Sequence, residues 1–171
     1  MLDLFEPDLY AASLKDVPLE ELKDRGIRGL IIDLDNTVTH WNHPSLDSQT
    51  LEWFQRAKGL GFKICLVSNN FRDRVKKVAA QLEVPALPRA GKPSRRAFRR
   101  AMEILGTGPE ETAVIGDQLL TDVLGGNRLH LFTILVVPLS RREFIGTRLM
   151  RWIEGYILKR LSLPSPYKKR L

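Results

Sequence analysis

The sequence predicts an α/β fold in which a parallel sheet of about five strands is covered by helices on both faces. Two observations predict it. Short segments rich in Ile, Leu and Val alternate along the chain with longer segments whose apolar residues recur at helical spacing. The chain has 171 residues, of which 43% are apolar and 27% charged, as expected for one soluble domain. Such alternation is typical of a parallel sheet between two helical layers.

The expected elements follow one another in a regular order. We expect strands at 29–33, 62–68, 84–87, 112–116 and 132–137. We expect helices at 46–58, 72–82, 94–105 and 119–127, with Ser94 as the N-cap of the third. Residues 1–139 would then form the domain core, and residues 140–171 a separate C-terminal segment.

The net charge of +7 lies in the C-terminal segment. Residues 1–139 contain 18 Lys or Arg and 18 Asp or Glu, whereas residues 140–171 contain nine Lys or Arg and two Glu. This asymmetry indicates a basic segment that meets an anionic partner, either nucleic acid or a membrane.

The C-terminal segment also predicts an amphipathic helix over 143–161. Its apolar stripe would contain Ile145, Leu149, Trp152, Ile153, Tyr156 and Ile157. Its other side would contain Arg148, Arg151, Gly155 and Lys159, with Phe144 and Leu158 among them. Such a helix can lie in the headgroup plane of an anionic bilayer. Alternatively, the stripe packs on the sheet of its own domain.

Other features exclude several classes of protein. The single cysteine, Cys65, lies in an apolar run and excludes an internal disulfide framework. The N-terminal residues lack the features of a signal peptide, and the longest apolar run, 129–139, is too short for a membrane span. We therefore expect a cytoplasmic protein that can associate peripherally with the inner face of the membrane. The three histidines, His40, His43 and His130, do not form a plausible metal site.

Polar side chains follow the ends of several expected strands. They are Asp33, Asp35 and Thr37 after the first strand, Ser68 and Asn69 after the second, Lys92 in a later loop, and Asp117 and Asp122 after the fourth. Ligands of such sheets bind at the carboxyl ends of the strands, so we expect these side chains to converge there. The carboxylates would repel one another unless a divalent cation compensated them, and Mg²⁺ suits such oxygen ligands.

The residue types divide into chemical roles. Asp33 can attack phosphorus and form an acyl phosphate, and Asp35 can act as general acid and then general base. We expect the phosphate to be bound by Thr37, Ser68, Asn69 and Lys92. We expect the metal ligands to come from Asp33, Asp35, Asp117 and Asp122. Asp122 would be either an outer ligand or the partner that orients Lys92.

Four of these stretches resemble the motifs of the haloacid dehalogenase-like (HAD) phosphatases. They are D-L-D-N-T from Asp33, S-N-N from Ser68, K-P from Lys92 and G-D-Q-L-L-T-D from Gly116. The resemblance implies a Rossmann-like HAD domain, and Asp35 favours a phosphatase over a dehalogenase. Only about 30 residues separate Thr37 from Ser68, and about 23 separate Ser68 from Lys92, which leaves no room for a cap domain. Family members without a cap have open sites for bulky substrates or borrow a lid from a partner.

The chain is also similar to the YqeG-type subfamily, which is related to phosphatidylglycerophosphate phosphatases. The stretches that carry this likeness are G-D-Q-L-L-T-D-V-L-G-G-N-R and V-V-P-L-S-R-R-E-F-I-G-T-R. They imply removal of the terminal phosphate from phosphatidylglycerophosphate at a membrane. Two alternatives stay open: a phosphatase of soluble nucleotide or sugar phosphates, and a non-catalytic protein that docks on RNA or the ribosome. The basic C-terminal segment has no recognisable RNA-binding motif, which disfavours nucleic acid as the partner. The sequence does not define the oligomeric state.

Overall fold

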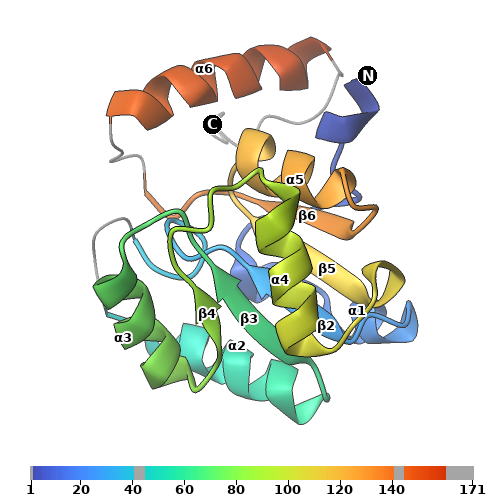
Figure 1. The fold of residues 1–171 in the computed structure, drawn as a ribbon, viewed down its shortest axis with the longest axis vertical. Coiled ribbons are helices and arrows are strands. Elements are labelled where there is room, and N and C mark those ends of the chain that lie inside the picture. Colours follow the sequence, from blue (N-terminus) through green and yellow to red (C-terminus); the bar gives the residue numbers. More distant parts are fainter. Residues whose placement is uncertain (1, 41–44, 141–144, 161–171) are drawn as a thin grey trace.

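The computed structural model describes residues 2–40, 45–140 and 145–160, with the side chains of the last helix described from Ile153 onward. Its centre is a parallel sheet of six strands in the order β1-β6-β5-β2-β3-β4 (Figure 1). The strands are β1 Leu9–Ala11, β2 Gly29–Ile32, β3 Lys63–Val67, β4 Ala86–Leu87, β5 Thr112–Gly116 and β6 Phe132–Val136. The parallel sheet is confirmed, with one strand more than expected.

The additional strand, β1, pairs with β6 at one edge of the sheet. It has three residues, and all of them are only partly buried. A segment so short has no apolar periodicity to detect, so the sequence pattern could not predict it.

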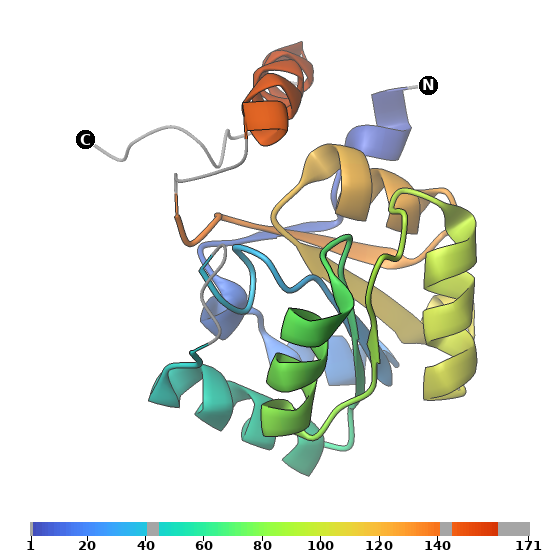
Figure 2. The ribbon, with the colours of Figure 1, turned by 60° about the vertical axis from the view of Figure 1, so that its left-hand side comes forward.

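Helices cover both faces of the sheet, as expected (Figures 1 and 2). They are α1 Leu19–Asp24, α2 Ser48–Gly59, α3 Arg72–Leu82, α4 Arg95–Leu105, α5 Leu124–Asn127 and α6 Ile145–Arg160. Leu30 and Ile32 of β2 pack in one core cluster with residues of α1, α2 and α3. Ile31 packs in a second cluster with α4 residues such as Phe98. All four β2 residues are buried, because alternate side chains of a doubly covered strand enter different cores.

The expected helix over 119–127 is not uniform. It begins as a π-helical turn, η4 (Leu119–Val123), and continues as α5. The wide turn is closed by the Leu124 amide, which donates to the Leu119 carbonyl. Single π turns of this kind often occur at functional sites, and η4 carries the predicted site residue Asp122.

Helix α6 lies outside η4 and α5 (Figures 1 and 2). Among the described side chains of α6, Glu154 and Leu158 are buried, and Leu158 packs with Leu119, Val123 and Leu135. Tyr156, from the predicted apolar stripe, is 57% exposed. The helix therefore packs on the domain partly through Leu158, which the sequence pattern placed on the basic side. In the described part of the chain, no helix is both long and apolar enough to cross a membrane.

Candidate active site

Asp33 is the first residue beyond β2, and its amide donates to the Ile115 carbonyl of β5 at 2.9 Å. The chain then turns back sharply. Asn36 adopts a left-handed conformation (φ 63°), and its amide donates to the Thr39 carbonyl at 2.7 Å. Asparagine tolerates this conformation better than most residues. The turn brings the Thr37 hydroxyl to within 3.4 Å of the Asp117 carboxylate, to which it donates.

Three buried carboxylates meet at the carboxyl edge of the sheet. One oxygen each of Asp33, Asp117 and Asp122 lies within 4.8 Å of the others. The close approach of Asp122 depends on Gly116, because a Cβ there would collide with the Asp122 carboxyl group. The structure therefore brings together three of the four predicted metal ligands.

Lys92 reaches this group from the loop after β4, with 3% of its side chain exposed. Its ammonium group donates to Asp122 Oδ1 at 2.6 Å and to Asp33 Oδ1. Asp122 thus makes the Lys92 contact that one of its two predicted roles requires, and it also lies among the three carboxylates. Asn69, predicted to bind phosphate, has its side chain on the Lys92 backbone: Oδ1 accepts from the amide at 2.8 Å, and Nδ2 donates to the carbonyl at 3.2 Å.

Asp35 lies beside the three carboxylates rather than among them. Its Oδ2 accepts from Ser68 Oγ at 3.2 Å and from Asn70 Nδ2 at 3.3 Å. Its Oδ1 is paired with the Arg74 guanidinium group, which also donates to Thr39 Oγ1 at 2.9 Å. The Asp35 side chain thus lies next to the acidic cluster, and its oxygens contact cationic and polar donors.

The buried charges perturb one another. Burial raises the pKa of Asp33 to about 7, and the Asp122 and Asp35 carboxylates add to this while Lys92 opposes it. Burial alone would lower the pKa of Lys92, but the carboxylates of Asp122 and Asp33 outweigh burial and raise it. A strongly perturbed carboxyl beside a buried ammonium is typical of a functional site.

The Asp33 shift predicts a pH dependence of metal binding. The folded protein keeps a proton on Asp33 up to about pH 7, whereas the unfolded chain releases it near the ordinary value of 3.8. In the metal-free protein this group therefore makes the free energy of unfolding fall as the pH rises between these values. Metal binding needs the ionised carboxylate, so Mg²⁺ should raise the melting temperature more at about pH 8 than at about pH 5.5.

Thermal denaturation with and without Mg²⁺ measures this difference. Asp33→Asn should remove most of the pH dependence, because its amide does not titrate in this range. An equal Mg²⁺ effect at both pH values in the unmodified protein would contradict the prediction that Asp33 is a metal ligand.

The sequence analysis did not single out three residues that make contacts in the site region. Asn70 stands inside the S-N-N stretch, so adjacency to Ser68 was a usable signal. Arg74 lies in the first turn of the helix that follows, and Glu154 lies in α6. Arg74 contacts Asp35, and Glu154 accepts a hydrogen bond from the Leu120 amide. Neither residue has a sequence signal of its own, because its partner is more than 30 residues away along the chain.

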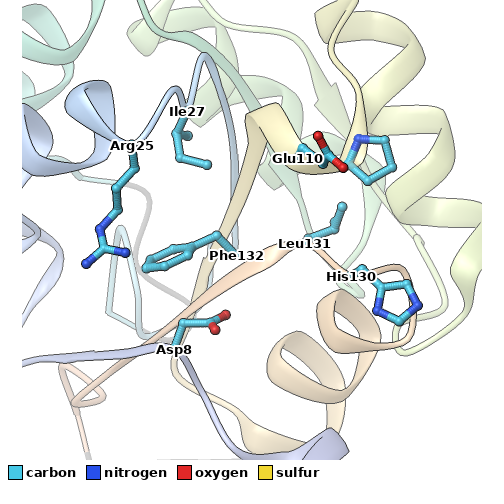
Figure 3. A pocket seen from close by; sticks show the side chains of 8 residues that line it. Asp8, Arg25, Ile27, Glu110, His130, Leu131 and Phe132 are labelled. Carbon is cyan, nitrogen blue, oxygen red and sulfur yellow. The ribbon is translucent and has the colours of Figure 1, made fainter.

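A surface hollow of about 340 Å³ lies elsewhere, at the amino ends of β2, β5 and β6 (Figure 3). His130 lines it, and the Arg25 guanidinium group stands 5.3 Å from the centre of the Phe132 ring. The Asp8 carboxylate accepts from the Thr133 amide at 2.7 Å, so it fixes the start of β6. The hollow is thus at the opposite edge of the sheet from the predicted site residues. His43, which was not expected to bind metal, lies outside the described residues.

Comparison with known proteins agrees with this geometry. A family model described as haloacid dehalogenase-like hydrolase matches residues 41–130. The chain is 43% identical over 158 residues to "Probable phosphatase YqeG" of Bacillus subtilis, with 92% of each protein covered. The chain belongs to the haloacid dehalogenase-like hydrolases. Within this family it is an enzyme of the phosphatase type.

Further relatives of this HAD phosphatase include two phosphatidylglycerophosphate phosphatases. The protein from Arabidopsis thaliana is 28% identical over 90% of the chain, and that from Chlamydomonas reinhardtii is 30% identical over 90%. The chain spans 47% and 61% of these two proteins, respectively. Among solved structures, the cobalt-bound deoxy-D-mannose-octulosonate 8-phosphate phosphatase of Haemophilus influenzae has a TM-score of 0.55 at 17% identity, covering 80% of this chain and 90% of that one. This likeness shows the shared HAD fold.

Proposed function

We propose that this HAD phosphatase is a magnesium-dependent phosphomonoesterase that removes the terminal phosphate of phosphatidylglycerophosphate at a membrane surface. The observation that carries the chemistry is the position of Asp33. Its carboxylate lies at the end of β2 beside Asp117 and Asp122, and it is paired with the Lys92 ammonium group. A carboxylate paired with a cationic group can approach a phosphoryl group that would otherwise repel it.

The residues at the site fit a divalent ion. Asp33, Asp117 and Asp122 are buried close together, and the Lys92 ammonium group pairs with Asp33 and Asp122. Buried carboxylates are costly without compensation, and oxygen ligands of this kind suit Mg²⁺. We assign Asp33, Asp117 and Asp122 to hold the ion. When bound, it would neutralise charge on the phosphoryl oxygens.

The reaction would proceed in two displacements. An Asp33 oxygen attacks phosphorus, the bond from phosphorus to the leaving oxygen breaks, and an acyl phosphate forms on Asp33. Asp35 gives its proton to the leaving oxygen. A water then attacks the acyl phosphate, Asp35 takes a proton from that water, and inorganic phosphate leaves with the Asp33 carboxylate restored. Lys92 stabilises the negative charge in both steps, and the Ser68 and Thr37 hydroxyls lie at the same edge of the sheet.

The surroundings of the site support a lipid substrate. Phe71, at the start of α3 and directly after Asn70, is 69% exposed. The Arg89 guanidinium group stands 5.1 Å from the centre of its ring, and Arg72 beside it is exposed. An exposed aromatic ring with cationic neighbours suits the headgroup region of an anionic bilayer. The basic C-terminal helix, with Tyr156 exposed, adds a second surface of the same chemistry.

Phosphate release in the presence of Mg²⁺ tests the substrate. The substrates are phosphatidylglycerophosphate in phosphatidylglycerol vesicles, glycerol 3-phosphate, a nucleotide and a sugar phosphate. We expect kcat/KM for the vesicle substrate to exceed that for the soluble esters by roughly a hundredfold, because remote contacts also lower the barrier. Phe71→Ala should slow the vesicle reaction several-fold and leave soluble esters unaffected.

Ile104→Ala is the matched control, because Ile104 is another exposed apolar side chain (39%) but lies on α4. It should change neither reaction. A preference for soluble esters would refute the lipid substrate and leave the phosphatase chemistry intact. No Mg²⁺-dependent phosphate release from any of the four substrates would refute the proposed reaction.

A further inference from the structure

Glu154 is a buried acid in the C-terminal helix α6, with 1% of its surface exposed. It is the only acidic residue in a helix that otherwise carries basic charge. Its Oε1 accepts a hydrogen bond from the Leu120 backbone amide at 2.9 Å. A glutamate is rarely buried so completely unless it makes such contacts, so the bond indicates a specific role.

The Leu120 amide belongs to the first turn of η4, where backbone amides have no partner within their own helix. The residue in the N-cap position, Gln118, provides no capping bond from its side chain. Glu154 therefore caps η4 from another element. An anionic group is also favourable at this end of a helix.

The capped turn carries Asp122. The Asp122 carboxylate accepts from the Gln118 amide at 3.3 Å and from the Lys92 ammonium group at 2.6 Å. One turn beyond Glu154, Leu158 packs against Leu119 and Val123. Helix α6 thus contacts both ends of η4, and Asp122 lies between these contacts.

We propose that Glu154 is a positioning residue through which α6 holds Asp122, and with it Lys92, in the geometry that the reaction needs. The inference rests on the proposed function, since it takes Asp122 and Lys92 as parts of the active site. Helix α6 is then a part of the catalytic unit as well as a surface that binds the membrane. A displacement of η4 by a fraction of an ångström would act on both Asp122 and Lys92.

Three variants separate geometry from charge. Glu154→Ala removes the bond, Glu154→Gln keeps an acceptor oxygen at the same reach, and Glu154→Asp keeps the charge but shortens the side chain. Glu52→Ala, at an exposed position on α2, is the matched control. The readouts are kcat and KM for a soluble phosphomonoester, corrected for the folded fraction, and hydrogen exchange of the amides at 118–124.

We expect Glu154→Ala and Glu154→Asp to lower kcat roughly tenfold with little change in KM, and to speed exchange of the Leu120 amide by a similar factor. Glu154→Gln should stay within about twofold of the unmodified enzyme, like Glu52→Ala.

An unchanged kcat in both shortened variants would overturn the proposal, and so would a loss in Glu154→Gln equal to that in Glu154→Ala. If Glu154→Ala does not fold, Glu154→Asp and Glu154→Gln decide. An unmodified protein without phosphatase activity would refute the proposed function, and the exchange data alone would then decide whether Glu154 orders η4.

Discussion

An Asp33→Asn enzyme is expected to lose kcat by roughly four orders of magnitude or more, because the amide cannot form the acyl phosphate. The fold should persist. Asp33 is buried and its ionised form is disfavoured there, as the raised pKa shows, so an isosteric neutral group is tolerated. Phosphate release measures the activity, and thermal denaturation confirms that the variant is folded.

The covalent intermediate provides an independent readout. Acid quenching of the unmodified enzyme during turnover should trap a species heavier by one phosphoryl group, with the group on Asp33. Asp33→Asn should show none. Asp24→Asn, the same substitution at an exposed position at the end of α1, should keep full activity. Turnover by Asp33→Asn at the normal rate would mean that another group is the nucleophile.

The acidic cluster was predictable from the sequence because a parallel sheet places the carboxyl ends of its strands at one edge. Asp33 and Asp117 each follow a fully buried strand made mostly of apolar residues, and such strands are recognisable without coordinates. Spacing alone could not show that Asp122 contacts Lys92, because the two positions are 30 residues apart and meet only in the folded chain.

The parts that were not predictable depend on tertiary packing. The pattern of α6 placed Leu158 among basic residues, yet Leu158 is fully buried and Tyr156 is exposed. Amphipathic periodicity identifies an apolar stripe but not which partner covers it. The Arg74 and Asp35 pair likewise depends on how α3 packs beside the loop after β2, and no local pattern encodes that.

Lys92→Met is expected to impair stability and catalysis together. Its ammonium group is the donor that Asp33 and Asp122 share, and it is 3% exposed. Removing one member of a buried ionic group costs about 3–5 kcal/mol because the remaining charges lose compensation. For a chain of this size that corresponds to a fall in melting temperature of roughly 10 °C. The loss in kcat should be about a hundredfold or more, as for removal of other groups that stabilise transition-state charge.

Added Mg²⁺ and a second substitution separate the effect of Lys92→Met on stability from its effect on catalysis. Mg²⁺ should recover part of the lost stability of Lys92→Met, because it supplies positive charge to the same carboxylates. Lys92→Met combined with Asp122→Asn should be more stable than Lys92→Met alone, since one uncompensated carboxylate is gone, yet it should recover no activity. Lys76→Met, at an exposed position on α3, should behave as the unmodified enzyme. If Lys92→Met melts at the same temperature as Lys76→Met without metal, the ammonium group does not compensate the buried carboxylates, and its role would be limited to binding substrate.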